Sequence, residues 1–86
     1  MMRRKKEDIR VLHIENNADN RRLVHEILVN NGFEVDEAAS GMEGIRKALN
    51  AKPDVILLDL NLPDLDGYEV TLKIRGDARA KDVAIV

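Results

Sequence analysis

Short apolar runs and amphipathic segments alternate along this 86-residue chain, and that alternation restricts the fold more than any other feature. Apolar runs rich in β-branched residues predict strands, whereas apolar residues three and four positions apart predict helices. We expect strands at residues 9–14, 33–38, 54–60 and 83–86 and helices at residues 18–31, 41–51 and 68–75. Strands separated by crossover helices favour an α/β fold with a parallel sheet and helices on both faces.

Polar residues and glycines mark the expected helix ends. Asn17 and Ser40 are suited to cap the first two helices, and Gly32 and Gly76 to end the first and the third. The strand at 54–60 is the most apolar, which predicts a central strand covered on both faces. The inward faces of the helices are expected to consist of Leu23, Val24, Ile27 and Leu28, then Met42, Ile45, Ala48 and Leu49, then Val70 and Ile74.

Composition excludes several classes of function. The chain has no cysteine, so it has no disulfide, no thiolate zinc site and no cysteine nucleophile. A formal net charge of −2, with one Tyr and one Phe, argues against nucleic-acid binding. The longest apolar run is far below the roughly 20 residues of a membrane span. We therefore expect a cytoplasmic domain over residues 9–86, preceded by a charged, solvated arm at 1–8.

Acidic and amide side chains follow two of the expected strands. Glu15 and Asn16 follow the first strand, and Asp59 with Asn61 follow the apolar core of the third. In parallel sheets ligands bind outside the carboxyl ends of the strands, and clustered oxygen ligands suit Mg²⁺. An Asp beside such an ion can act as a nucleophile toward a phosphoryl group. The alternative is that these are solvated loop residues. His13 is expected to be a hydrogen-bonded structural residue rather than a ligand.

Three segments strongly resemble the receiver domain of two-component response regulators. They are VLHIENNADNRRLV at residues 11–24, GFEVDEAASGMEGI at 32–45 and PDVILLDLNLPDLDGYEV at 53–70. The resemblance implies a flavodoxin-like fold with strand order 2-1-3-4-5 and a signalling role rather than enzymatic activity. It implies that Asp59 accepts a phosphoryl group from a sensor histidine kinase or a phosphotransfer protein. It further implies Mg²⁺ bound by Glu15, Asn16, Asp59 and the backbone carbonyl of Asn61.

The sequence departs from the family pattern in two respects. Asn16 is a neutral amide where the family has a second acid, so we expect Mg²⁺ to bind weakly. The family's switch hydroxyl and lysine would lie after Val86, so we expect a truncated receiver that lacks helix 4, strand 5 and helix 5 and is impaired in switching. The fourth strand would then be an open edge, which predicts a homodimer through strands 3 and 4. Its interface would contain Val55, Leu57, Val83, Ile85 and Val86.

Two alternatives to a phosphorylated receiver remain at this point. One is a degenerate or truncated receiver that serves as a non-phosphorylated dimerisation or interaction module. The other is a small flavodoxin-like enzyme or nucleotide binder, but Glu15, Asn16 and Asn17 stand where a glycine-rich phosphate loop would be expected.

Overall fold

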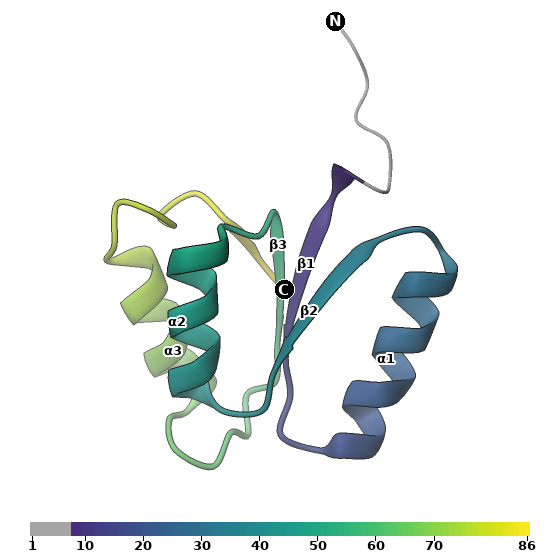
Figure 1. Cartoon of the computed structure of the whole chain (residues 1–86). Coiled ribbons are helices and arrows are strands. Elements are labelled where there is room, and N and C mark those ends of the chain that lie inside the picture. Colours follow the sequence, from purple (N-terminus) through teal and green to yellow (C-terminus); the bar gives the residue numbers. More distant parts are fainter. Residues whose placement is uncertain (1–7) are drawn as a thin grey trace, which may run out of the picture.

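The computed structural model describes residues 8–86, so the expected arm at 1–8 lies outside the described residues except for Asp8. Within residues 8–86 four strands alternate with three helices (Figure 1). All strand pairs are parallel, in the order β2-β1-β3-β4. This confirms the predicted α/β, flavodoxin-like arrangement. The elements are β1 (Arg10–Ile14), α1 (Ala18–Asn30), β2 (Glu34–Ala38), α2 (Gly41–Ala51), β3 (Val55–Leu58), α3 (Gly67–Arg75) and β4 (Ala84–Ile85).

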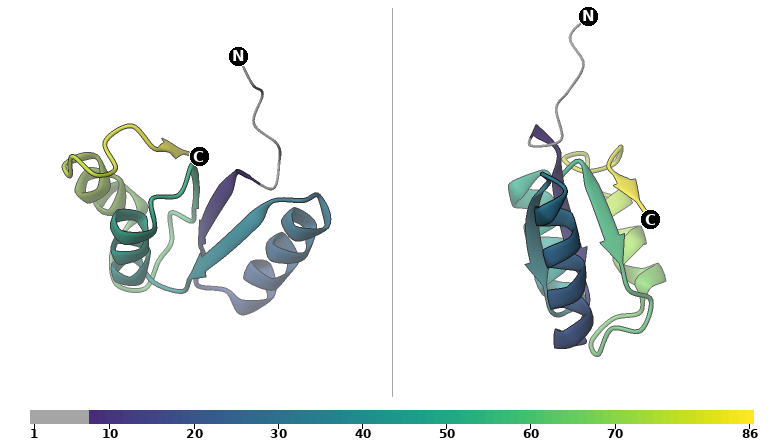
Figure 2. Two further views of the ribbon diagram at one scale, coloured as in Figure 1. Left: turned by 45° about the horizontal axis from the view of Figure 1, so that its top comes forward. Right: turned by 90° about the vertical axis from the view of Figure 1, so that its right-hand side faces the viewer.

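The helices form two layers around the sheet. Helix α1 lies on one face, and α2 and α3 lie side by side on the other (Figure 2). The main apolar core fills the space beneath α2 and α3, because side chains at alternate strand positions point to the same face. This core contains Leu12, Ile14, Ala38, Ala48, Ile56, Val70, Ile74 and Ala80.

The predicted helix ends are confirmed by their hydrogen bonds. Asn17 accepts from the backbone N–H of Asn20 at 2.9 Å, and Ser40 accepts from that of Glu43 at 3.2 Å. Gly32 follows α1 with φ 90°, a left-handed conformation that favours glycine. Each end is therefore determined by residues only a few positions apart, which explains why sequence reasoning located it.

The expected inward faces of α1 and α2 are partly wrong. Leu23 and Ile27 of α1 are 57% and 51% exposed, and Met42 of α2 is 61% exposed. None of the residues of α1 is buried, whereas α2 buries Gly41, Gly44 and Ala48. Helical spacing identifies an apolar stripe but does not determine how far a neighbouring element covers it. Val24 and Leu28 on α1 and Ile45 and Leu49 on α2 are half-buried, so part of each expected stripe is shielded.

Strands β3 and β4 are covered on one face, so two residues of the expected dimer interface, Val83 and Ile85, pack inside the molecule instead. Ile56 is fully buried, and Val83 and Ile85 pack against the main core. We predicted that both faces of β3 are covered, and this is wrong for one face, because Val55 and Leu57 are only half-buried. The strand is also shorter than expected because it ends at Leu58, and the chain then turns.

Candidate functional site

Glu15 and Asp59 lie at the same edge of the sheet, at the carboxyl ends of neighbouring strands. The backbone N–H of Asp59 donates to the carbonyl of Ile14 at 2.9 Å, immediately after β3 pairs with β1. The N–H of Glu15 donates to the carbonyl of Ala38 at 2.9 Å, at the end of β2. Both acidic residues are half-buried. The sheet ladder therefore brings the two predicted carboxylate residues to the edge where parallel sheets bind ligands.

The chain turns sharply after Asp59. The backbone N–H of Asn61 donates to Asp59 Oδ1 at 3.0 Å, and the N–H of Gly67 donates to the carbonyl of Leu60 at 3.2 Å. A Cβ atom on Gly67 would lie 2.5 Å from Leu60 Cδ2 and 2.9 Å from Leu60 Cα. This closure of the loop requires glycine at position 67. The Asp59 carboxylate is thus oriented by the same turn that carries the Asn61 carbonyl.

Asn16 is exposed and contacts the loop that follows β2. Its side-chain Nδ2 donates to the carbonyl of Ala39 at 3.4 Å. A carboxylate at this position could not make that contact, because it has no N–H to donate. The amide that replaces the expected acid therefore links two loops at the carboxyl edge.

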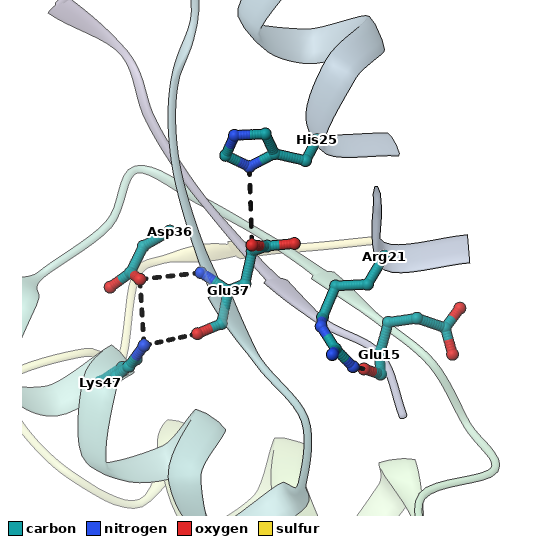
Figure 3. Close-up of polar contacts among 6 residues, drawn as sticks. All are labelled: Glu15, Arg21, His25, Asp36, Glu37 and Lys47. Atoms are coloured by element: carbon teal, nitrogen blue, oxygen red, sulfur yellow. Dashed lines mark hydrogen bonds and ion pairs between the residues drawn. The ribbon is translucent and has the colours of Figure 1, made fainter. Parts of the chain in front are cut away.

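Arg21 belongs to this edge but was not identified from the sequence. Its Nη1 donates to the backbone carbonyls of Glu15 at 2.9 Å and of Asn16 at 3.2 Å. Figure 3 shows the guanidinium beside the Glu15 backbone, with the Glu15 carboxylate pointing away from it. Arg21 lies near the N-terminus of α1, where the helix dipole disfavours a positive charge. This unfavourable position was the signal in the sequence that other polar groups hold the Arg21 side chain.

His13 is 6% exposed, and its Nδ1 has no hydrogen-bond partner among the described residues, so the expected hydrogen bond is not found at that atom. Burial lowers the pKa of His13 from its ordinary value of 6.5, against the opposing charges of Glu15 and Glu37. Glu37 also lies 3.7 Å from Nδ1 of His25, and its carbonyl accepts from Lys47 (Figure 3). His13 is therefore a buried side chain behind the carboxyl edge, where burial favours its neutral form.

The candidate donors at this edge are two charged and two neutral oxygen ligands. Glu15 and Asp59 supply carboxylates, whereas Asn16 and the Asn61 carbonyl can supply neutral oxygens. Within residues 8–86 there is no group of three or more His, Cys, Asp or Glu residues that could hold a metal. All four candidate donors are oxygen ligands of the kind that Mg²⁺ accepts alongside water. The donor types therefore fit Mg²⁺, with one negative charge fewer than a three-acid site.

A parallel sheet with crossover helices and carboxylates at the ends of two central strands defines a flavodoxin-like α/β module. The family model described as "Response regulator receiver domain" matches residues 11–86, and the chain belongs to this family. It is a receiver domain of the kind found in two-component response regulators. Such domains interact with histidine kinases or phosphotransfer proteins and bind Mg²⁺ at the active site. No helix within residues 8–86 is long and apolar enough to cross a membrane.

Two curated relatives place the match in larger proteins. The chain is 48% identical over 60 residues to a protein-glutamate methylesterase/protein-glutamine glutaminase of Archaeoglobus fulgidus, covering 69% of this chain and 17% of that protein. It is 41% identical over 68 residues to the transcriptional regulatory protein ResD of Bacillus subtilis, covering 79% of this chain and 28% of that protein. The chain thus spans less than a third of either relative.

Solved structures confirm the fold. The chemotaxis response regulator CheY4 of Vibrio cholerae matches with a TM-score of 0.86 and 34% identity, over 90% of this chain and 64% of that one. The receiver domain of a sensor histidine kinase from Pseudomonas aeruginosa matches with the same TM-score and identity, over 90% of this chain and 63% of that one. That second structure has a magnesium ion coordinated in its active-site cleft.

Proposed function

We propose that this receiver accepts a phosphoryl group on Asp59 from a histidine of a sensor kinase or phosphotransfer protein. An oxygen of the Asp59 carboxylate attacks phosphorus, the new O–P bond forms an acyl phosphate, and the P–N bond to the donor imidazole breaks. The observation that carries this proposal is the position of Asp59, hydrogen-bonded to Ile14 at the end of β1 and adjacent to Glu15. The alternative of a non-phosphorylated interaction module is not favoured, because both carboxylates are retained at this edge.

Phosphorylation can be tested by intact-mass measurement after treatment with acetyl phosphate and Mg²⁺. We expect slow labelling confined to Asp59, because the neutral Asn16 amide should bind Mg²⁺ less tightly than a carboxylate, which leaves less positive charge to offset that of the incoming anion. Asp59→Asn should abolish the mass increase, whereas Asp82→Asn should not, since Asp82 is an exposed acid that precedes β4. Labelling that persists in Asp59→Asn would refute the assignment.

Glu15, Asn16, Asp59 and the Asn61 carbonyl are proposed as the Mg²⁺ ligands. When bound, the ion supplies positive charge that stabilises the phosphoryl group during transfer. Binding should be weak, and Asn16→Asp should tighten it by about 1–2 kcal/mol through one charge-assisted contact. The loss of the exposed 3.4 Å contact with Ala39 offsets little of this gain. NMR titration of the Asp59 and Asn61 amides measures both affinities, and equal values would contradict the proposed ligand set.

A homodimer through β3 and β4 forms part of the proposal. Ile56 and Ile85 face the core, so Val55 and Leu57 point to the opposite face, where they are half-buried. Val86 is 78% exposed, and the outer edge of β4 has no partner strand within residues 8–86. Because Val83 and Ile85 pack internally, the proposed interface is now restricted to Val55, Leu57 and Val86. Light scattering at micromolar concentration should give a dimer mass that Leu57→Lys reduces to that of a monomer. A stable wild-type monomer would refute it.

The same proposal covers the class of activity, the location and the partners of this chain. We assign a signalling switch rather than a turnover enzyme to residues 9–86, because the methylesterase relative is matched over only 17% of its length. We also propose a cytoplasmic location, and we expect no nucleic-acid partner for this chain because its formal net charge is −2.

A further inference from the structure

The loop from Asp59 to α3 is shaped by local hydrogen bonds but is located by a contact with another helix. Its local bonds are those of Asn61 with Asp59, of Gly67 with Leu60, and of the Asp66–Glu69 capping box. Each joins residues within seven positions of one another, so together they determine the shape of the loop. The bond of Asp59 to Ile14 locates the start of the loop at β1, but none of these bonds determines where residues 61–66 lie relative to α2.

Asp64 provides a long-range contact between this loop and α2. Its Oδ1 accepts from the backbone N–H of Gly41 at 2.7 Å, and its Oδ2 accepts from that of Met42 at 2.9 Å. Both carboxylate oxygens are therefore bound to the first turn of α2, where the helix dipole favours negative charge. These backbone hydrogen bonds, first that of Met42 and then that of Gly41, lower the pKa of Asp64 below its ordinary value.

Steric evidence independently shows how close this approach is. A Cβ atom on Gly41 would lie 3.0 Å from Leu65 Cβ, 3.0 Å from Val70 Cγ2 and 3.1 Å from Asp64 Oδ1. Leu65 also packs at the edge of the main core. The absence of a side chain at Gly41 thus allows the loop to lie directly against the start of α2.

The start of α2 contacts the other candidate loop as well. The carbonyl of Ala39 accepts from the Asn16 side chain at 3.4 Å, and the N–H of Ala39 donates to Glu43 Oε1 at 2.8 Å. Residues 39–43 therefore lie between the loop that carries Glu15 and Asn16 and the loop that carries Asp59 and Asn61.

We infer that Asp64 is a positioning residue: Asp59 is held at the end of β1 by its backbone bond to Ile14, and Asp64 holds the Asn61 side of the turn by binding the first turn of α2. The inference rests on the proposed function of Asp59 and Asn61, because only then does the location of this turn affect chemistry. Asp64 is not one of the proposed metal ligands. Its role is to keep the Asn61 carbonyl and the Asp59 carboxylate where both can engage the same ion.

The test compares Asp64→Ala with Ser40→Ala. Both variants remove a side chain that caps α2. Ser40 accepts from the backbone N–H of Glu43 and, among the described residues, has no hydrogen bond to the loop from Asp59 to α3. Asp64→Ala removes the two hydrogen bonds to Gly41 and Met42. In this variant we expect the amide of Asn61 to exchange with solvent about fivefold faster and Mg²⁺ affinity to fall by about fivefold. Ser40→Ala should lower the urea midpoint while leaving both quantities unchanged.

A pH titration provides a second measurement and covers the case in which Asp64→Ala fails to fold. In the wild type the amide shifts of Gly41, Met42 and Asn61 should move together as Asp64 is protonated. Other carboxyl groups lie in the same region, so the Asp64-dependent part of the shift change is the part that Asp64→Asn removes; these groups are Asp59, Asp66, Glu43 and Glu69. Equal exchange rates at Asn61 in Asp64→Ala and Ser40→Ala, or an Asn61 titration unchanged in Asp64→Asn, would overturn the inference. If the wild type binds no Mg²⁺, the metal proposal fails, whereas the exchange and titration data still decide the role of Asp64.

Discussion

Replacing Gly44 with alanine tests how closely α2 lies against β1. A Cβ atom at this position would lie 2.5 Å from Cδ1, 2.9 Å from Cγ1 and 3.0 Å from Cγ2 of Ile14. Ile14 has no exposed surface, so its side chain cannot move into solvent to relieve the contact. The helix must shift away from the sheet, or Ile14 must leave its preferred rotamer.

The expected magnitude follows from two opposing effects. Alanine is favoured over glycine within a helix by about 1 kcal/mol. Overpacking a filled core costs about 1–3 kcal/mol, and here three atoms of one buried side chain lie within 3.0 Å. We therefore expect Gly44→Ala to lower the free energy of unfolding by up to about 2 kcal/mol, measured by urea denaturation, with no change in the slope of that free energy against urea concentration.

A double-mutant cycle with Ile14→Val identifies the cause. Valine lacks Cδ1, the atom closest to the added methyl group, so it removes the worst contact. Ile14→Val alone should cost about 0.5–1.5 kcal/mol. The double variant should be more stable than the sum of the single effects predicts, by at least about 0.5 kcal/mol. A Gly44→Ala variant more stable than the wild type, or strict additivity, would show that α2 and β1 are not in close contact here.

Three further outcomes are expected. Lys52 ends α2 in a left-handed conformation with φ 51°, which glycine adopts with less strain than other residues. Lys52→Gly should therefore raise the free energy of unfolding, measured by urea denaturation, by about 1 kcal/mol, whereas Lys52→Ala should not. Burial lowers the pKa of His13 below its ordinary value of 6.5, so the unfolded chain binds a proton at His13 more readily than the folded chain does. The contribution of His13 to the free energy of unfolding should therefore be fully present above pH 6.5 and decline as the pH falls below 6.5. Thermal melts at several pH values should show a weaker decline in His13→Leu, and an identical pH dependence would argue against this cause. Ile85 packs against the core, so Ile85→Asp should lower the urea-derived free energy of unfolding by at least about 2 kcal/mol, and a neutral effect would contradict that packing.

Much of the fold could be predicted because its determinants are local. The cap of α1 depends on Asn17 and Asn20, and that of α2 on Ser40 and Glu43, three residues apart in each case. The apolar run of β3 likewise identified the central strand, although its observed end at Leu58 is earlier than expected. The extent of burial could not be predicted for Leu23 or Met42, because it depends on which elements cover each helix.

Only some residues of the candidate site could be predicted from the sequence. Asp59 and Glu15 could be located because they directly follow strands, and parallel strands bring their carboxyl ends to one edge. Arg21 and Asp64 could not be identified, since each acts through backbone groups in other segments. An arginine in a helix and an acid in a loop are each ordinary surface residues until their partners are known.

The sequence by itself determined the order of strands and helices, most of their ends, and the residues that follow each strand. It did so because side-chain periodicity and capping involve neighbours within a few positions. Only the tertiary structure decided that Asp64 binds Gly41 and Met42, that Arg21 binds the Glu15 carbonyl, and that Ile85 is covered while Leu23 is exposed. The Asp64 contacts join residues more than twenty positions apart, and they form only when crossover helices pack on the sheet and bring separate loops to a common edge.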